Sequence, residues 1–179
     1  MITLSPTPEL RTERLVLRAP AASDWPIWRD FILSDRGRFM RPADMDEALA
    51  WRAFGHVIGH WVMRGFGAFV FTRAGDDRAL GMAGPWHPAG WPEPEILWSV
   101  WDAAAQGQGL AREAARATLD HAFRDLGWTT AVSYIAPDNT RSIALARGLG
   151  AVADTGAAVP DGRPAVAWRH KAPSAPEAA

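Results

Sequence analysis

A short glycine loop, residues 106–111 with the sequence Gln-Gly-Gln-Gly-Leu-Ala, is the feature that most constrains the fold of this chain. It follows an apolar run at 96–101 that is typical of a buried strand, and it overlaps the start of an amphipathic run at 110–126 that indicates a helix. Glycines let successive backbone N–H groups turn toward one point, and a helix start adds about half a positive charge. The arrangement predicts an anion site that a pyrophosphate would fit; the competing interpretation is a tight turn that binds nothing.

Two common phosphate motifs do not fit this loop. A Walker loop needs a Lys and a Ser or Thr after its last glycine, but Gly109 is followed by Leu110, Ala111 and Arg112. The dinucleotide fingerprint needs a Gly or Ala where Arg112 stands, and it belongs on the first strand of a βαβ unit, whereas this loop lies in mid-chain. The pattern that remains is Gln-x-x-Gly-x-Ala.

This pattern and two others resemble the GCN5-related N-acetyltransferase (GNAT) superfamily. Residues 12–18, Thr-Glu-Arg-Leu-Val-Leu-Arg, followed by Asp24, look like the opening strand of the branch that includes the ribosomal-protein N-terminal acetyltransferases. Asn139 and Ser142, ahead of Gly-Leu-Gly-Ala at 148–151, resemble that branch's Asn-x-x-Ser helix. The three motifs stand in the family's order and cover about residues 11–170.

The resemblance implies a site for acetyl-coenzyme A and no metal. Family members hold the pyrophosphate on backbone N–H groups of the loop, and the strand before it meets the acetyl and pantetheine portions. Carried over position by position, the cofactor residues are Val100, Trp101, Gln106, Gly107, Gln108, Gly109, Leu110, Ala111, Asn139 and Ser142. On spacing alone, the Asn and Ser are equally well explained as a helix cap and an exposed first-turn residue.

Acetyl transfer to an amine needs a base, and Glu95 is the first candidate because it opens the strand that leads to the acetyl group. The competing interpretation is a solvated residue at a strand end, and His87 is a second candidate base. The chain has no cysteine, which excludes a thiol acyl-enzyme and favours direct attack in a ternary complex. His56 and His60 are four residues apart, but they lack the Glu and the third ligand of a zinc motif.

The acid that protonates the leaving thiolate is not evident from the sequence. Many relatives carry a Tyr seven residues after the Asn, whereas this chain has Ala146. Its one tyrosine, Tyr134, belongs to the preceding strand. Ser142, Tyr134 and water therefore remain candidates.

The acceptor is predicted to be a primary amine, on a small molecule or at a peptide N-terminus. An α-amino group with a pKa near ~7.8 costs about 1 kcal/mol to deprotonate at pH 7, whereas a lysine side chain near ~10.4 costs about 4.6 kcal/mol. A single carboxylate therefore favours an α-amine or another weakly basic amine. Two other functions remain open: a catalytically degenerate acyl-coenzyme A sensor or scaffold, and an α/β domain without a cofactor.

Length and charge suit one domain at 11–171 followed by a disordered tail at 172–179. A net charge of −1 argues against nucleic-acid binding. Neither a signal-peptide pattern nor a run of 18 apolar residues is present, so we expect a cytoplasmic protein without membrane contact. The sequence leaves a homodimer open.

Periodicity predicts an α/β (α+β) fold with a mixed sheet flanked by helices, in the order β-α-α-β-β-β-α-β-α-β-β. The resemblance to the GNAT superfamily implies that the central sheet is mostly antiparallel. Residues 1–11 are expected to be loosely held, Asp44 is expected to cap the second helix, and the prolines at 85–94 argue against a central strand there. The expected elements are strands at 14–18, 66–72, 79–85, 95–101, 129–136, 152–158 and 164–170, and helices at 24–33, 45–64, 110–126 and 139–149.

Overall fold

The computed structural model describes residues 4–162 and 164–172 of the chain. The predicted tail therefore lies almost wholly outside the described residues. The elements in chain order are β1 (Leu10–Arg11), β2 (Leu15–Arg18), α1 (Trp25–Leu33), α2 (Glu47–Arg64), β3 (Phe69–Arg73), β4 (Ala79–Trp86), β5 (Glu95–Val100), α3 (Leu110–Arg124), β6 (Ala131–Ile135), α4 (Thr140–Gly148), β7 (Val152–Asp154) and β8 (Val166–His170).

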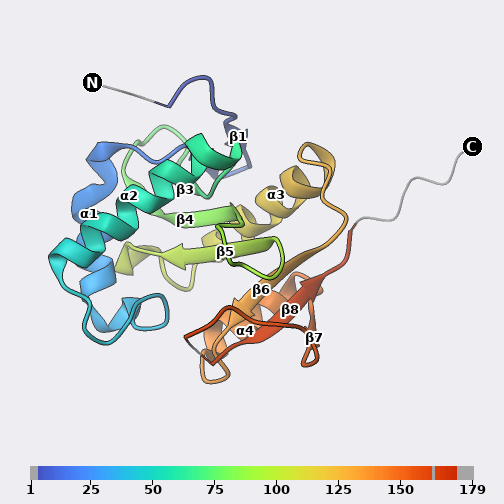
Figure 1. Ribbon diagram of the computed structural model, residues 1–179. Coiled ribbons are helices and arrows are strands. Elements are labelled where there is room, and N and C mark those ends of the chain that lie inside the picture. Colours follow the sequence, from blue (N-terminus) through green and yellow to red (C-terminus); the bar gives the residue numbers. More distant parts are fainter. Residues whose placement is uncertain (1–3, 163, 173–179) are drawn as a thin grey trace, which may run out of the picture.

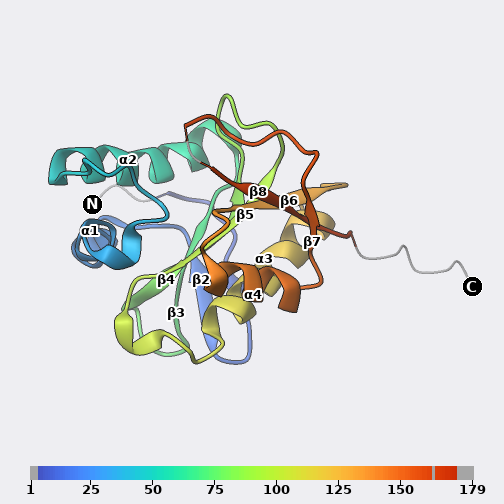
Figure 2. The same ribbon diagram turned by 90° about the horizontal axis from the view of Figure 1, so that it is seen from below.

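The strands form one sheet in the order β1-β2-β3-β4-β5-β6-β8-β7 (Figure 1). Every neighbouring pair in the described sheet is antiparallel except β5 and β6, which are parallel. Helices α1 and α2 lie on one side of the sheet, and α3 and α4 lie on the other (Figure 2). The predicted fold class and element order are confirmed, with the short β1 as an addition.

Two local predictions at the N-terminal side were wrong. Residues Leu10 and Arg11 are not loose, because they pair with β2. The second helix is capped by Asp46, whose carboxylate accepts the N–H of Leu49 at 2.7 Å, rather than by Asp44. Its C-terminal end is as predicted: Gly65 follows the helix with a φ of 75°, a conformation that glycine adopts readily.

Strand β4 is a central strand even though it contains Pro85 and extends to Trp86. The β3 ladder ends at the pair Phe69–Ala83, so beyond that point β4 pairs with β5 alone. Pro85 therefore interrupts no ladder on the β3 side, which is why a proline is tolerated there. Residues 87–94 do lie outside strands, as predicted.

The two faces of the sheet carry separate apolar clusters. On the α1 and α2 side, Trp28, Phe31 and Phe54 pack with Met82 and Trp101. On the other side, Leu110 and Ala114 of α3 pack against β2, β3 and β4, and further α3 residues pack against Ile96 of β5. Strands β4 and β5 are thus fixed from both faces. In the part of the chain that the structure describes, no helix is long and apolar enough to span a membrane.

Candidate active site

Strands β5 and β6 meet at one end and then diverge. Their ladder consists of the single pair Glu95–Val132, next to which the N–H of Val132 donates to the carbonyl of Pro94 at 3.0 Å. One residue further, the hydroxyl of Ser133 donates to the carbonyl of Ile96 at 2.6 Å. Beyond the end of the backbone ladder, the side chain of Ser133 therefore still links β6 to β5.

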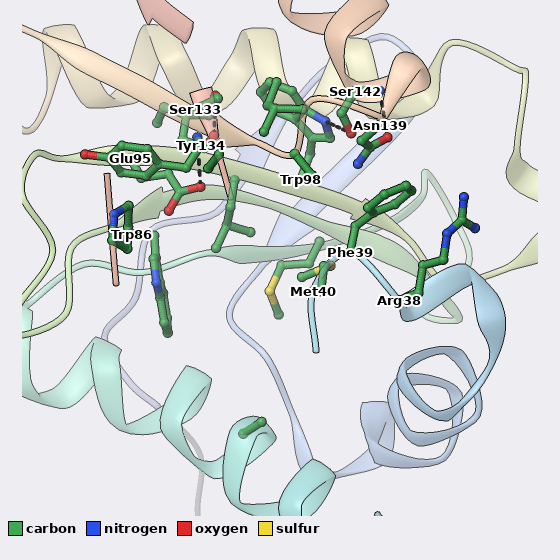
Figure 3. A pocket seen from close by; sticks show the side chains of 18 of the residues that line it. Arg38, Phe39, Met40, Trp86, Glu95, Trp98, Ser133, Tyr134, Asn139 and Ser142 are labelled. Atoms are coloured by element: carbon green, nitrogen blue, oxygen red, sulfur yellow. Dashed lines mark hydrogen bonds between the residues drawn. The ribbon is translucent and has the colours of Figure 1, made fainter. Parts of the chain in front are cut away.

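A cavity of about 690 Å³ opens beside this divergence (Figure 3). Its volume is in the range of small-molecule sites. The lining comes from α1, α2, the segment 38–45, β4, the loop residue Trp91, β5, β6, the start of α4, and residues 160, 161, 164 and 165. Glu95, Tyr134, Asn139 and Ser142 line it together, whereas residues 106–111, Val100 and Trp101 are not among its described lining residues. The cavity thus joins the candidate base to the predicted cofactor helix α4.

Glu95 is buried, with 8% of its surface exposed, so it is not a solvated strand-end residue. The indole N–H of Trp91 donates to Oε2 at 2.7 Å, and the backbone N–H of Tyr134 donates to Oε1 at 3.4 Å. These two donors, one from the 87–94 loop and one from β6, fix the position of the carboxylate. Glu95 pairs with Trp86 across β4 and β5, so the two side chains share the sheet face that α1 and α2 cover.

The loop that leads to Glu95 is anchored by Arg169. Its guanidinium contacts Glu93 at 2.7 Å and Asp154 at 2.8 Å, and it also donates to the hydroxyl of Thr130 at 2.9 Å. Both carboxyl pKa values lie below their usual range, chiefly because Arg169 donates hydrogen bonds to them. The anchor ties the end of the 87–94 loop to β7 and β8.

The glycine loop has the backbone shape that an anion site requires. Gly107 and Gly109 have φ angles of 74° and 76°, a region that other residues rarely adopt. Helix α3 begins at Leu110, and among the described residues no side chain caps it. The N–H groups of its first turn therefore point out of the helix start and donate to no capping side chain. These donors include the amides of Leu110 and Ala111, two of the predicted cofactor residues.

The remaining loop residues hold the loop in place. Gln108 accepts a hydrogen bond from Arg14 on its carbonyl at 3.1 Å, and its side-chain amide donates to the carbonyl of Ala104 at 2.6 Å. The side chain of Gln106 accepts from Arg141 of α4 at 3.0 Å. The two predicted cofactor elements, the loop and α4, are therefore linked directly.

The two predicted cofactor contacts, Val100 and Trp101, differ in whether their backbone N–H and carbonyl groups remain available to a ligand. The N–H of Trp101 donates to Leu80 of β4 at 2.8 Å, and its carbonyl accepts from Arg36 at 2.7 Å. Because backbone groups alternate in direction along an antiparallel strand, those of Val100 point the other way, toward β6. Val100 therefore faces the gap, whereas Trp101 is committed to the protein interior.

Asn139 and Ser142 form the start of α4. Asn139 is the N-cap, because its side-chain oxygen accepts the N–H of Ser142 at 3.2 Å. The hydroxyl oxygen of Ser142 accepts the indole N–H of Trp98 at 3.3 Å, which leaves the hydroxyl proton to point elsewhere (Figure 3). Ala146, at the position where relatives carry Tyr, is fully buried.

Tyr134 is a weaker candidate for the acid than Ser142 because of its position, away from the predicted cofactor residues of α4 (Figure 3). Its hydroxyl is buried and has no hydrogen bond of ordinary geometry within the described part of the chain. Burial, with the nearby charge of Glu93, raises the pKa of Tyr134 to about 12. Figure 3 shows its ring beside Glu95, away from Asn139 and Ser142.

The histidines named from the sequence are structural or peripheral. His60 is buried, its Nδ1 lies 2.9 Å from the carbonyl of Phe66, and its Nε2 accepts the N–H of His87 at 3.0 Å. Both ring nitrogens are therefore occupied, so His60 cannot serve as a metal ligand beside His56. No group of three metal-ligating side chains occurs among residues 4–162 and 164–172. His87 is not among the described residues that line the cavity.

A buried histidine supports the strand junction. Since the Ser133 hydroxyl donates to Ile96, the Nε2–H of His170 must donate to Ser133, at 2.9 Å. Burial, with Arg116 as a further cause, lowers the pKa of His170 to about 4, so the ring is neutral at pH 7. Its Nδ1 is buried without a partner in the described chain, so a second proton there would find no acceptor.

This arrangement predicts acid sensitivity. An unfolded His titrates near ~6.5, so between that pH and the folded value of about 4 the unfolded chain binds more protons, and stability falls as the pH falls. We expect a loss on the order of 3 kcal/mol across this window, measured by urea unfolding. His170→Gln keeps a donor but cannot titrate, and it should show a clearly shallower decline; an unchanged decline would contradict the assignment.

Helix α2 and the 85–94 segment contribute Val57, Trp86 and Trp91 to the cavity lining. Sequence reasoning did not single out Phe39 and Met40 of the segment between the first two helices, nor Ser133. The segment has no periodicity, and Ser133 alternates within an ordinary strand, so only the tertiary structure reveals their roles.

A family model described as Acetyltransferase (GNAT) domain matches residues 14–152. This chain therefore belongs to the GNAT family of acetyltransferase domains, which confirms the predicted family.

Solved structures agree with that assignment. An acetyltransferase from Agrobacterium tumefaciens str. C58 is 33% identical, with 95% of this chain and 98% of that chain covered and a TM-score of 0.85. The ribosomal-protein-S5-alanine acetyltransferase of Vibrio fischeri is 14% identical, with coverages of 94% and 98% and a TM-score of 0.69. RimJ of Mycobacterium smegmatis, solved with CoA-disulfide, is 20% identical, with coverages of 92% and 85% and a TM-score of 0.67. The last two share the fold and represent the branch that the sequence resembles.

Proposed function

We propose that this chain is an N-acetyltransferase that moves the acetyl group of acetyl-coenzyme A to a primary amine. One observation carries the proposal: a single cavity connects the buried carboxylate of Glu95 with Asn139 and Ser142 at the start of α4. The family supplies acetyl transfer as the type of reaction. The cavity brings a candidate base and a candidate cofactor element to the same space.

The glycine loop fits the pyrophosphate of the donor. The positive φ angles of Gly107 and Gly109 shape the loop, and the uncapped first turn of α3 supplies N–H donors. Backbone groups of Val100 that face β6 would receive the pantetheine arm. These residues bind and orient the thioester, which raises the effective concentration of the two reactants.

The chemical step that these residues support is direct attack. The amine nitrogen bonds to the thioester carbonyl carbon, Glu95 takes the proton that the amine loses, and the carbon–sulfur bond breaks. The leaving thiolate takes a proton from Ser142 or from water, and the proton held by Glu95 returns through solvent to the group that gave one, so that no charge is left in the site. Ser142 is suited to this role because its oxygen already accepts the Trp98 indole N–H, so its own proton is available for donation.

A catalytically degenerate acyl-coenzyme A sensor is the second candidate. The observation in its favour is Ala146, a buried residue without any acidic proton where relatives carry Tyr. Such a module would bind the donor through the same loop and α4. It would show no turnover with any amine, which separates it from the transferase.

Steady-state kinetics test the proposal. Direct attack requires both substrates to be bound together, so double-reciprocal lines at several amine concentrations should intersect. The chain contains no cysteine that could carry the acetyl group in between. Parallel lines, together with an acetylated enzyme trapped by mass spectrometry, would show that the transfer is indirect.

A further inference from the structure

The part of the cavity between α1, α2, the segment 38–45, β4 and β5, here called the acceptor half, is apolar. It lies on the side of the sheet that α1 and α2 cover, opposite α3 and α4 (Figure 2). Its apolar lining residues are Trp28, Ile32, Phe39, Met40, Met45, Val57, Met82, Trp86, Trp91 and Leu97. Phe39, Met40, Met45, Trp91 and Leu97 are partly exposed, as is typical of a surface that a ligand covers.

The walls of the acceptor half are held rigidly by contacts outside it. The ring of Trp86 stacks on His60 with centroids 4.4 Å apart. Trp28 packs edge-on against Trp101 at 5.3 Å, and its indole N–H donates to the carbonyl of Ala50. A rigid aromatic wall loses little entropy on binding, so it favours an apolar group of matching size over a small or polar one.

Charge in the cavity is confined to few places. Among the described lining residues the carboxylates are Glu95, Asp138 and Asp161. Asp138 adjoins the cap of α4, and Asp161 lies with Arg38 and Arg41 around a neighbouring depression. The acceptor half therefore offers one buried carboxylate, Glu95, which suits one amine and leaves a second ammonium group without a partner.

From these observations we infer that the acceptor is a primary amine joined to an aromatic or other large apolar group. The inference rests on the proposed function and names its substrate class. The apolar group lies against the rings and methionines of the acceptor half, and the amine reaches Glu95. The same chemistry occurs in free arylalkylamines, in amides of aromatic amino acids and in peptides that begin with an aromatic residue.

Matched pairs of amines test this class and separate its sources. Phenylalaninamide is compared with glycinamide, 2-phenylethylamine with butylamine and with butane-1,4-diamine, and a Phe-initiated peptide with the Gly-initiated one. Release of coenzyme A from acetyl-coenzyme A gives kcat/KM for each. We expect the aromatic member of each accepted pair to be favoured by about tenfold or more, since one methylene alone is worth about that much in an apolar pocket.

A substitution in the wall provides a second test. Met40→Glu puts a carboxylate into the acceptor half and should lower kcat/KM for phenylalaninamide by about tenfold or more without weakening acetyl-coenzyme A binding. Met63→Glu makes the same chemical change on the outer face of α2, where Met63 is 84% exposed, and should leave both quantities unchanged. Equal effects of the two variants would overturn the inference.

Failure of the inference and failure of the proposed function give different results. Preferential acetylation of glycinamide or the diamine would refute the apolar acceptor and leave the transferase standing. If no amine turns over, calorimetric titration of the same amines into the coenzyme A-loaded protein still decides the inference. Tighter binding of the aromatic amines by about tenfold would support it, and equal or reversed affinities would overturn it.

Discussion

Replacing Glu95 by Gln is expected to lower kcat by about 10² or more at pH 7 while leaving acetyl-coenzyme A affinity nearly intact. The amide is close in size to the carboxylate but cannot take a proton. Its oxygen can still accept the Trp91 indole N–H, which in the native protein donates to Oε2 at 2.7 Å. The rate of the variant should recover at high pH, because the free amine then forms without a base. Stopped assays from pH 6 to 9, with donor affinity followed by tryptophan fluorescence, measure both quantities.

The matched control is Glu47→Gln, the same change at an exposed side chain in the first turn of α2. It should leave kcat and donor affinity at wild-type values. If Glu95→Gln also retains the wild-type kcat across this pH range, Glu95 is not the base. The role would then pass to water.

Replacing Gly109 by Val is expected to weaken acetyl-coenzyme A binding by about 10² or more. A β-branched residue disfavours the φ of 76° by about 1–2 kcal/mol, and its side chain would stand where the anion approaches the loop. Within the protein itself there is room, since the nearest atom to an added Cβ, Arg14 Nη2, lies 3.7 Å away. The expected loss therefore concerns the ligand more than the fold, and isothermal titration calorimetry measures it.

Gly75→Val is the matched control for this change. Gly75, in the turn between β3 and β4, has a φ of 83° and no neighbour within 4 Å of an added Cβ. The variant should incur a similar backbone cost and keep full donor affinity. If a folded Gly109→Val protein binds acetyl-coenzyme A with wild-type affinity, the glycine loop is not part of the donor site.

Local sequence signals predicted the elements whose ends are marked by particular residues. Gly65 ends α2 because it adopts a left-handed conformation, and Asn139 begins α4 because its side chain caps the helix. The glycine loop was located because its residue types are unusual between a strand and a helix. The cap of α2 was misplaced because Asp44 and Asp46 are chemically equivalent signals, and only the fold of the preceding segment distinguishes them.

The site was harder to predict because it depends on pairs that are distant in the chain. The carboxylate of Glu95 accepts the N–H of Tyr134, 39 residues away, and the Ser133 hydroxyl that links β6 to β5 donates to Ile96, 37 residues away. None of these contacts leaves a periodic pattern in the sequence. The apolar acceptor half likewise arises only when segments from five elements converge, so the sequence could suggest an amine without suggesting its substituent.

The most direct test of acetyl transfer at this site is a single assay of the purified chain with acetyl-coenzyme A and an aromatic α-amine, followed by thiol release and mass spectrometry of the amine. Glu95→Gln is run beside the wild type at pH 7. We predict that thiol and N-acetylated amine appear in equal amounts and that the variant forms both at least about 10² more slowly. Tight donor binding without any acetylated amine, or equal rates for the two proteins, would contradict an acetyltransferase that uses Glu95 as its base.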